Sequence, residues 1–250
     1  MAAGRPVTPA LLDEVLEAHG GAERWRSANE IRAHVRTGGF LVRTRFPGNR
    51  MAEYDLLVNV AEPRSEFTPF PEAGKRAVFE RGSVRVEDDD GGLLAARDDP
   101  RSAFGGPGGL RRNFRWDPLD ATYFAGYAMW NYLTTPHLLT REGVSVREGQ
   151  PWTEGGETWR RLEVDFPVDL DTHSAHQTFY VDGAGLIRRH DYTAEPVGRW
   201  AKAAHYSTEH REFDGLVFPT RRRVVPRGLG NRALPALTLV SIELDRVAVT

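Results

Sequence analysis

Cysteine is absent from the 250 residues of the chain, which excludes disulfide bonds, thiol catalysis and zinc sites built on cysteine. The sequence also lacks a run of about 18 apolar residues, so we expect no transmembrane segment. In the N-terminal stretch MAAGRPVTPALLDEVLEAHGG, the acidic residues Asp13, Glu14 and Glu17 interrupt the leucines. Because it has no continuous apolar core, this stretch does not read as a signal peptide, and we expect a cytoplasmic protein.

A strong excess of charge of one sign is missing as well. The chain has 33 lysine and arginine residues against 35 aspartate and glutamate residues, a formal net charge of −2. We therefore expect neither nucleic acid nor a membrane surface as a partner. Arginine nevertheless forms local clusters such as Arg221-Arg222-Arg223, and a cluster of this kind on one strand can create a local anion site.

The motifs of common catalytic and cofactor sites are also absent. No G-x-S-x-G stretch occurs, and the loop FGGPGG at residues 104–109 matches neither the dinucleotide fingerprint nor the P-loop. That loop is expected to be flexible and could gate a binding site. His173 and His176 would point to opposite faces of an extended chain, so they form a poor chelate. We therefore expect no metal site and no cofactor.

Helical patterns occur in two places. The first helix is expected to begin at Thr8-Pro9 and to end near residue 20, where two glycines follow. The longer pattern is WDPLDATYFAGYAMWNYLTTPHLL, in which Asp117 and Pro118 predict the start of a helix. Aromatic residues then recur at spacings of three and four, and Pro136 is expected to bend or end the helix.

Most of the remaining chain has the period-two pattern of β-strands. In the N-terminal half, strands are expected at residues 31–45, 50–60, 77–80, 83–87 and 93–97. Residues 61–76 contain three prolines and are expected to form a loop. In the C-terminal half, strands are expected at residues 158–166, 176–181, 186–192, 203–213, 217–225 and 237–249. We therefore expect a single domain over residues 1–250, mainly β, with a large antiparallel sheet and a few helices packed on one face.

Three stretches, AHGGAERW, FYVDGAGLIRR and FDGLVFPTRRRV, follow one another along the chain around the long aromatic helix. In this order the sequence resembles the lipoprotein-carrier superfamily (LolA/LolB-like), and most closely its uncharacterised actinobacterial members that lack a signal peptide. The resemblance implies an unclosed β-barrel whose concave face is covered by the N-terminal helix and the mid-chain aromatic helix. It also implies a cavity for a hydrophobic ligand.

The late strands carry more polar residues than an aliphatic cavity needs. In residues 186–192, one face takes Arg188, His190 and Tyr192, and the other takes Ile187, Arg189 and Asp191. Such residues either form a solvated convex face with salt bridges, or they line the cavity and bind an amphiphilic ligand with an anionic or carbonyl end. We expect the His190 side to line the cavity, because Tyr192 can continue an aromatic wall.

The polar residues suggest a catalytic hypothesis. His190 or His205 would act as general acid or base, oriented by Asp191. Arg188, Arg221 or Arg223 would stabilise an oxyanion. The remaining expected ligand-binding residues are Tyr123, Tyr127, Trp130, Tyr192 and His173.

Two functions remain open from the sequence. The first is a cofactor-independent cyclase, isomerase or dehydratase of secondary metabolism that acts on a hydrophobic or amphiphilic small molecule. The alternative is a non-catalytic carrier that holds a lipid or metabolite without changing it. Residue types and their spacing do not decide between the two, because both need an apolar pocket with a few polar groups.

Overall fold

The structure is a computed structural model that describes residues 9–46, 51–105, 109, 112 and 114–250. These residues form one antiparallel sheet of 13 strands in the order β6-β5-β4-β3-β2-β1-β13-β12-β11-β10-β9-β8-β7. The strands of the first half are β1 (Glu30–Gly38), β2 (Glu53–Asn59), β3 (Arg64–Thr68), β4 (Lys75–Glu80), β5 (Ser83–Asp88) and β6 (Leu93–Asp98). Those of the second half are β7 (Ser145–Glu154), β8 (Glu157–Asp165), β9 (His176–Val181), β10 (Ile187–Thr193), β11 (Lys202–Phe213), β12 (Leu216–Pro226) and β13 (Val240–Val249). Because β6 and β7 remain unpaired edges, the sheet is an unclosed β-barrel, as predicted.

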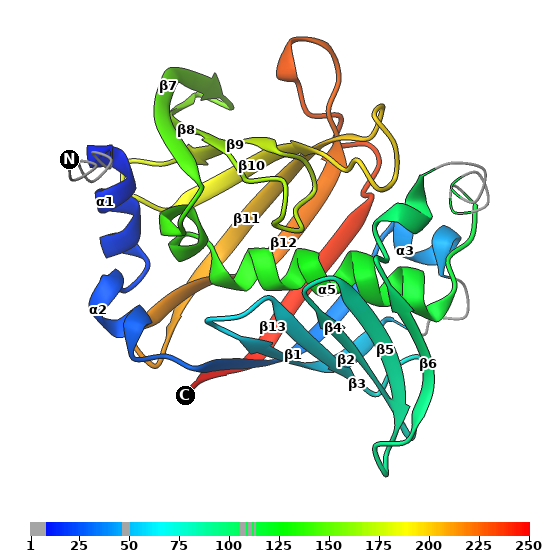
Figure 1. The fold of residues 1–250 in the computed structure, drawn as a ribbon. Helices are drawn as coiled ribbons and strands as arrows, with labels where there is room; N and C mark the ends of the chain where they lie inside the picture. Colours follow the sequence, from blue (N-terminus) through cyan, green and yellow to red (C-terminus); the bar gives the residue numbers. More distant parts are fainter. Residues whose placement is uncertain (1–8, 47–50, 106–108, 110–111, 113) are drawn as a thin grey trace, which may run out of the picture.

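The helices lie inside and beside the curved sheet (Figure 1). They are α1 (Ala10–Ala18), α2 (Gly21–Arg26), α3 (Phe40–Arg45) and the long α5 (Pro118–Thr134), with 3-10 turns at Ser102–Phe104, His137–Thr140 and Leu229–Asn231. Figure 1 shows α5 crossing the concave side between the two halves of the sheet, and α1 and α2 at one end. Among the described residues, no helix is both long and apolar enough to cross a membrane.

Helix α5 is the centre of the core. Its start is set as predicted, because Asp117 and Asp120 form a reciprocal capping box and Pro118 occupies the first turn. Hydrogen bonds from both halves of the sheet reach the helix backbone. The Ser65 hydroxyl of β3 donates to the Gly126 carbonyl at 3.0 Å, and the Arg222 guanidinium of β12 donates to the carbonyl of Tyr132 at 2.9 Å. The sheet therefore curves around α5 and buries it on most sides.

Two predictions about the N-terminal half are wrong. The strand expected at residues 31–45 ends at Gly38, and residues 40–45 form helix α3. The change occurs at Gly39, whose φ of 105° favours glycine and where a Cβ atom would lie 2.5 Å from the Leu239 carbonyl oxygen. The loop expected at residues 61–76 contains strand β3, because its prolines lie on either side of the strand, Pro63 before it and Pro69 and Pro71 after it, and do not interrupt it.

Strand β7 was not predicted at all. It is an edge strand without a buried face, so its sequence shows no apolar alternation. The other predicted strands and the two predicted helices are present, with ends that differ by a few residues. For the first helix, Thr8 lies outside the described residues, and Pro9 occupies the N-cap position.

Candidate functional site

An apolar cavity of about 300 Å³ lies between helices α3 and α5 and strands β10–β13. Helix α5 leaves this space because it presents small side chains to it. Ala121, Ala125 and Ala128 lie on one face of the helix at spacings of four and three, and all three line the cavity. The cavity therefore results from the alanine face of a helix that is otherwise rich in aromatic residues.

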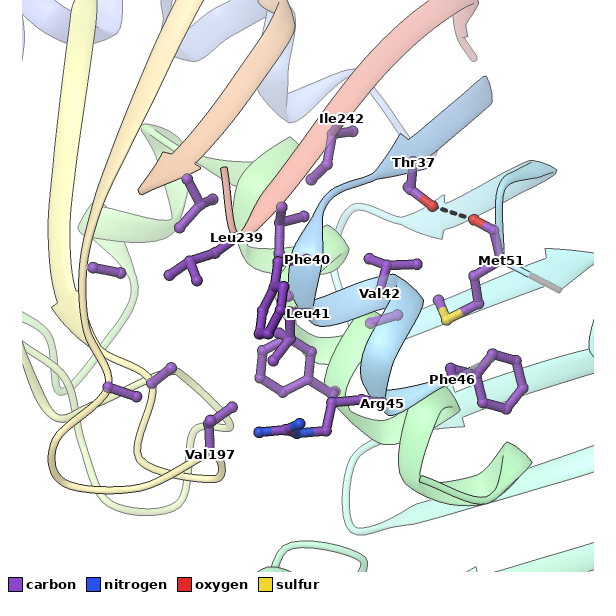
Figure 2. A pocket seen from close by; sticks show the side chains of 18 of the residues that line it. Thr37, Phe40, Leu41, Val42, Arg45, Phe46, Met51, Val197, Leu239 and Ile242 are labelled. Atoms are coloured by element: carbon purple, nitrogen blue, oxygen red, sulfur yellow. Dashed lines mark hydrogen bonds between the residues drawn. The ribbon is translucent and has the colours of Figure 1, made fainter. Parts of the chain in front are cut away.

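Helix α3 forms one wall of the cavity and part of its opening. Figure 2 shows Phe40 and Leu41 of this helix pointing toward the side where Leu239 and Val197 lie. Phe40 and Trp200 line the cavity and are 44% and 70% exposed, so the cavity reaches the molecular surface beside them. The segment that forms this wall is the one that the sequence pattern assigned to a strand.

Charged groups on the cavity wall are all of one sign. Among the described residues that line it, the charged side chains are Arg45, Lys202 and Arg227. Arg227 lies 3.3 Å from Asp191 behind the wall, whereas the guanidinium Nε of Arg45 is buried without a hydrogen-bond partner in the described structure. The cavity is thus apolar with cationic groups and no carboxylate on its described wall.

The inner end of the cavity is formed by two tyrosines. The hydroxyls of Tyr132 on α5 and Tyr192 on β10 lie 3.1 Å apart, and both side chains line the cavity. A hydrogen-bonded chain continues from Tyr132 to Nε2 of His173 at 2.6 Å and from Nδ1 of His173 to the Tyr127 hydroxyl at 3.0 Å. Burial lowers the pKa of His173 to about 3, so its ring is neutral and can either donate or accept at each end.

Behind the two tyrosines lies a second polar layer from β11 and β12. The ring of His205 packs edge-on against Tyr132 with centroids 4.6 Å apart, and the Arg222 guanidinium lies over the Tyr132 ring at 5.2 Å. Both side chains are buried. Burial lowers the pKa of Arg222 to about 10, which leaves the guanidinium charged at neutral pH.

His190 lies beside this layer on the same face of the sheet. Its ring stacks on Phe179 with centroids 4.1 Å apart, and its Nε2 pairs with the Gln177 side-chain oxygen. Burial holds the pKa values of His190 and His205 well below the usual range. Neither histidine belongs to the described cavity wall, which Tyr192 reaches from the same face.

Asp191 points to the opposite face of β10, contrary to the expectation that it orients His190. It forms a two-point ion pair with Arg189, at 2.7 Å and 2.9 Å, and accepts a hydrogen bond from the Tyr180 hydroxyl at 2.7 Å. Glu154 of β7 pairs with the same guanidinium. Neighbouring residues of a strand alternate between faces, so Asp191 and His190 cannot share a site on this strand.

The three arginines expected to hold an oxyanion lie outside the cavity. Arg221 is exposed and pairs with Glu209 at 2.9 Å. Arg223 is exposed and donates to the Thr238 hydroxyl at 2.9 Å. Arg188 occupies an irregular position of β10, where the pairing with β9 shifts by one residue. The arginine that points inward is Arg222, and the signal for it was the apolar Phe218 and Val224 on the same face of its strand.

Tyr123 and Trp130 are buried in structural contacts and do not line the cavity. The Tyr123 hydroxyl donates to Asp171 at 2.7 Å, and the Trp130 indole donates to the Asn59 carbonyl at 2.9 Å. Of the loop expected to gate the site, residues 106–108 lie outside the described residues. Within the described part of the chain, no group of three or more histidine or carboxylate side chains could hold a metal ion.

Comparisons with known proteins agree on the fold. No protein-family model matches the sequence, and no curated protein matches it either. Among solved structures, a LolA superfamily protein from Nitrosomonas europaea matches with a TM-score of 0.52 and 12% identity, over 98% of this chain and 94% of that chain. A DUF1329 family protein from Desulfovibrio piger matches with a TM-score of 0.50 and 11% identity, over 96% of this chain and 92% of that chain. At this level of identity the similarity concerns architecture, and it shows that the chain has the LolA-like fold.

Proposed function

We propose that the protein is a carrier that binds a hydrophobic or amphiphilic small molecule in the α3–α5 cavity and releases it unchanged. The observation that carries this proposal is the apolar cavity itself, which opens to the surface beside Phe40 and Trp200. Its volume of about 300 Å³ is at the lower end of the range of small-molecule sites.

A catalytic role has weaker support. The general acid or base of the catalytic hypothesis, His190 or His205, does not belong to the described cavity wall, and Asp191 lies on the other face of the sheet. A general base must come within hydrogen-bond reach of its substrate. The groups that do meet the cavity are mostly alanines, aliphatic and aromatic side chains, together with two tyrosine hydroxyls and the cations Arg45, Lys202 and Arg227. No histidine or carboxylate of the described residues is among them.

Binding can be tested with N-phenyl-1-naphthylamine, an uncharged dye whose fluorescence rises in apolar sites. We expect the protein to bind the dye, and Ala125→Trp to weaken binding at least about tenfold because the indole fills space that the dye needs. Ala22→Trp, on the exposed side of α2, is the matched control and should leave binding unchanged. Equal binding by the wild type and Ala125→Trp would refute the cavity as the site.

Release of an unchanged ligand needs a separate experiment. The purified protein is incubated with a lipid extract of its host, and the bound compounds are compared with the starting extract by mass spectrometry. We expect retention without change of mass. A retained compound that is converted to a product, with conversion lost in His190→Ala or His205→Ala, would overturn the carrier proposal.

A further inference from the structure

Behind the tyrosines at the inner end of the cavity lies a buried positive charge, Arg222, which has no acidic partner among the described residues. Arg222 is 7% exposed, and no carboxylate of the described residues forms an ion pair with it. Its hydrogen bonds go to the Ser207 hydroxyl at 3.4 Å and to the Tyr132 carbonyl at 2.9 Å, both uncharged acceptors. A buried charge is costly unless it is paired, so this guanidinium favours an anion nearby.

Several polar atoms beside this charge lack partners. The Nε of Arg222 and both ring nitrogens of His205 are buried without a hydrogen-bond partner in the described part of the chain. Most buried polar groups in proteins are hydrogen-bonded, so three such atoms in one layer are unusual. The Nε–H of Arg222 and the single N–H of the neutral His205 ring are donors that an acceptor entering from the cavity would satisfy.

This polar layer adjoins the cavity directly. Arg222 pairs across the sheet with Ile242, and His205 pairs with Val224; Ile242 and Val224 both line the cavity. Paired residues of neighbouring strands point to the same face of a sheet, so the apolar wall and the polar layer share one continuous surface. The Tyr132 ring separates them, with its hydroxyl next to that of Tyr192 on the cavity side.

Among the described residues, the other buried arginine is Arg189, which pairs with Asp191 and Glu154. The partly exposed Arg97 also has acidic partners, Asp117 and Asp120. The absence of a carboxylate at Arg222 is therefore specific to the face that meets the cavity. The described charged residues on the cavity wall are also all cationic, and Arg45 and Lys202 leave a net positive charge there, since only Arg227 is paired with a carboxylate.

We propose that the ligand is an amphiphilic carboxylic acid whose hydrocarbon part fills the α3–α5 cavity and whose carboxylate lies at the Tyr132–Tyr192 hydroxyl pair, with Arg222 as its counter-charge. This inference rests on the proposed carrier function and adds the chemical class of the ligand. The carboxylate accepts a hydrogen bond from the Tyr192 hydroxyl, which can act as a donor because the His173 chain accommodates either direction. The apolar surroundings strengthen its attraction to the guanidinium.

The test compares dodecanoic acid with 1-dodecanol, which has the same chain and no charge, as competitors of N-phenyl-1-naphthylamine at pH 8. We expect the wild type to bind the acid at least about tenfold more tightly than the alcohol. Arg222→Met should reduce this preference to less than about threefold, with the affinity for the alcohol unchanged, because only the charge is lost. Arg223→Met, one residue along the strand on the opposite face, is the matched control and should keep the full preference.

The test also includes a second variant, Tyr192→Phe, and an alternative location of the carboxylate beside Arg45. Tyr192→Phe keeps the shape of the cavity wall, removes the proposed donor, and should also lower the preference for the acid. If Arg45→Met abolishes the preference while Arg222→Met keeps it, the carboxylate lies at the opening of the cavity and the proposed location is wrong. Circular dichroism shows whether each variant is folded. If Arg222→Met does not fold, the preference of Tyr192→Phe for the acid over the alcohol decides the test.

The outcomes separate this inference from the carrier proposal. Equal affinity for acid and alcohol, with both blocked by Ala125→Trp, would overturn the inference and leave the carrier function intact. Failure of the dye and of both competitors to bind would overturn the carrier function as well. A preference for the acid that persists in both Arg222→Met and Tyr192→Phe would refute the assignment of these residues.

Discussion

Two buried arginines on opposite faces of the same sheet show the difference between a closed and an open polar network. Arg189 of β10 pairs with Asp191 and Glu154, and its guanidinium lies over the ring of Tyr180 at 4.9 Å. Arg222 of β12 has only uncharged hydrogen-bond partners in the described structure. Arg189 pairs with Tyr206 of β11, and Arg222 pairs with Ser207 of the same strand. Because Tyr206 and Ser207 are neighbours on β11 and point to opposite faces, the two arginines also lie on opposite faces of the sheet.

The two networks therefore have different roles. On the convex face, every charge of the Arg189 cluster is balanced, and the segment Leu229–Asn231 helps to cover it through a hydrogen bond from Arg189 to the Asn231 carbonyl at 2.7 Å. On the concave face, neutral histidines and one unbalanced cation lie next to an apolar cavity. Removing one partner of a balanced buried network leaves an uncompensated charge and is costly, whereas a buried cation that already lacks a counter-charge loses no ion pair when it is removed.

The largest expected effect concerns the histidines whose pKa values are lowered by burial, of which His173 stacks on Tyr192 on the concave side. Burial lowers the pKa of His173 to about 3 and those of His137 and His210 to about 4. In the unfolded chain these groups bind protons near pH 6.5, so between about pH 6.5 and pH 4 the unfolded state binds more protons and stability falls as the pH falls. From pH 7 to pH 5 each such histidine should cost about 2 kcal/mol of the free energy of unfolding.

Urea unfolding measured between pH 7 and pH 5 checks this dependence. His173→Phe removes one titrating group and should make the dependence on pH shallower by about one proton. His176→Phe, the same substitution at an exposed position, is the control for the change of side chain. A free energy of unfolding that is constant over this pH range would mean that these histidines, His173 included, are hydrated, and the contrast between His173 and the charged network of the convex face would disappear.

The second-largest expected effect comes from a substitution that breaks the network of Arg189, Asp191 and Glu154 on the convex face. Arg189→Met leaves the buried carboxylate of Asp191 without its two-point partner and should lower the free energy of unfolding by about 3–5 kcal/mol. Chemical denaturation at pH 8 measures the change. Because the double variant Arg189→Met/Asp191→Asn removes both charges, it should recover part of the loss. A change below about 1 kcal/mol in the single variant would show that this network is not a buried ion pair.

The smallest expected effect is an increase in the free energy of unfolding, and it distinguishes the surroundings of Arg222 from those of Arg189. Arg222→Met removes an unbalanced buried charge and should raise the free energy of unfolding by about 1 kcal/mol, since relief of desolvation exceeds the lost hydrogen bond to the Tyr132 carbonyl. Arg223→Met should change it by less than about 0.5 kcal/mol. Thermal and urea unfolding of both variants without ligand provide the measurement. A loss for Arg222→Met as large as that for Arg189→Met would show that Arg222 is part of the structural core.

Much of the fold could be predicted from local chemistry. The capping pair around Asp117 and Pro118 set the start of α5, and the DGAG and FDG turns set the late hairpins. Helix α3 was missed because FLVRTR is rich in aromatic and β-branched residues, which are typical of strands. The break after β1 occurs at Gly39, which lies too close to the backbone of the distant Leu239 for any side chain, and this contact is not visible in the local sequence. Strand β7 was missed because both of its faces are exposed, so its sequence has no apolar period.

The candidate site was predicted less completely. Period two places His190 and Tyr192 together, and the structure directs both toward α5 and the inner end of the cavity. The same period does not show which of the three consecutive arginines points inward, so Arg221 and Arg223 were expected in the site and Arg222 was not. The alanines of α5 gave no signal, because small residues on a helix are as common in tight packing as beside a cavity.

The sequence by itself determined the class of the fold, the long buried helix and the presence of titratable groups on the late strands, since these depend on periodicity, capping and turn chemistry along a few neighbouring residues. The tertiary structure alone decided which face of each strand is concave. It also decided that Asp191 is a partner of Arg189 rather than His190, and that Arg222 has no acidic partner in the described chain. Those outcomes depend on the curvature of the sheet and on contacts between residues far apart in the chain, which no local pattern records.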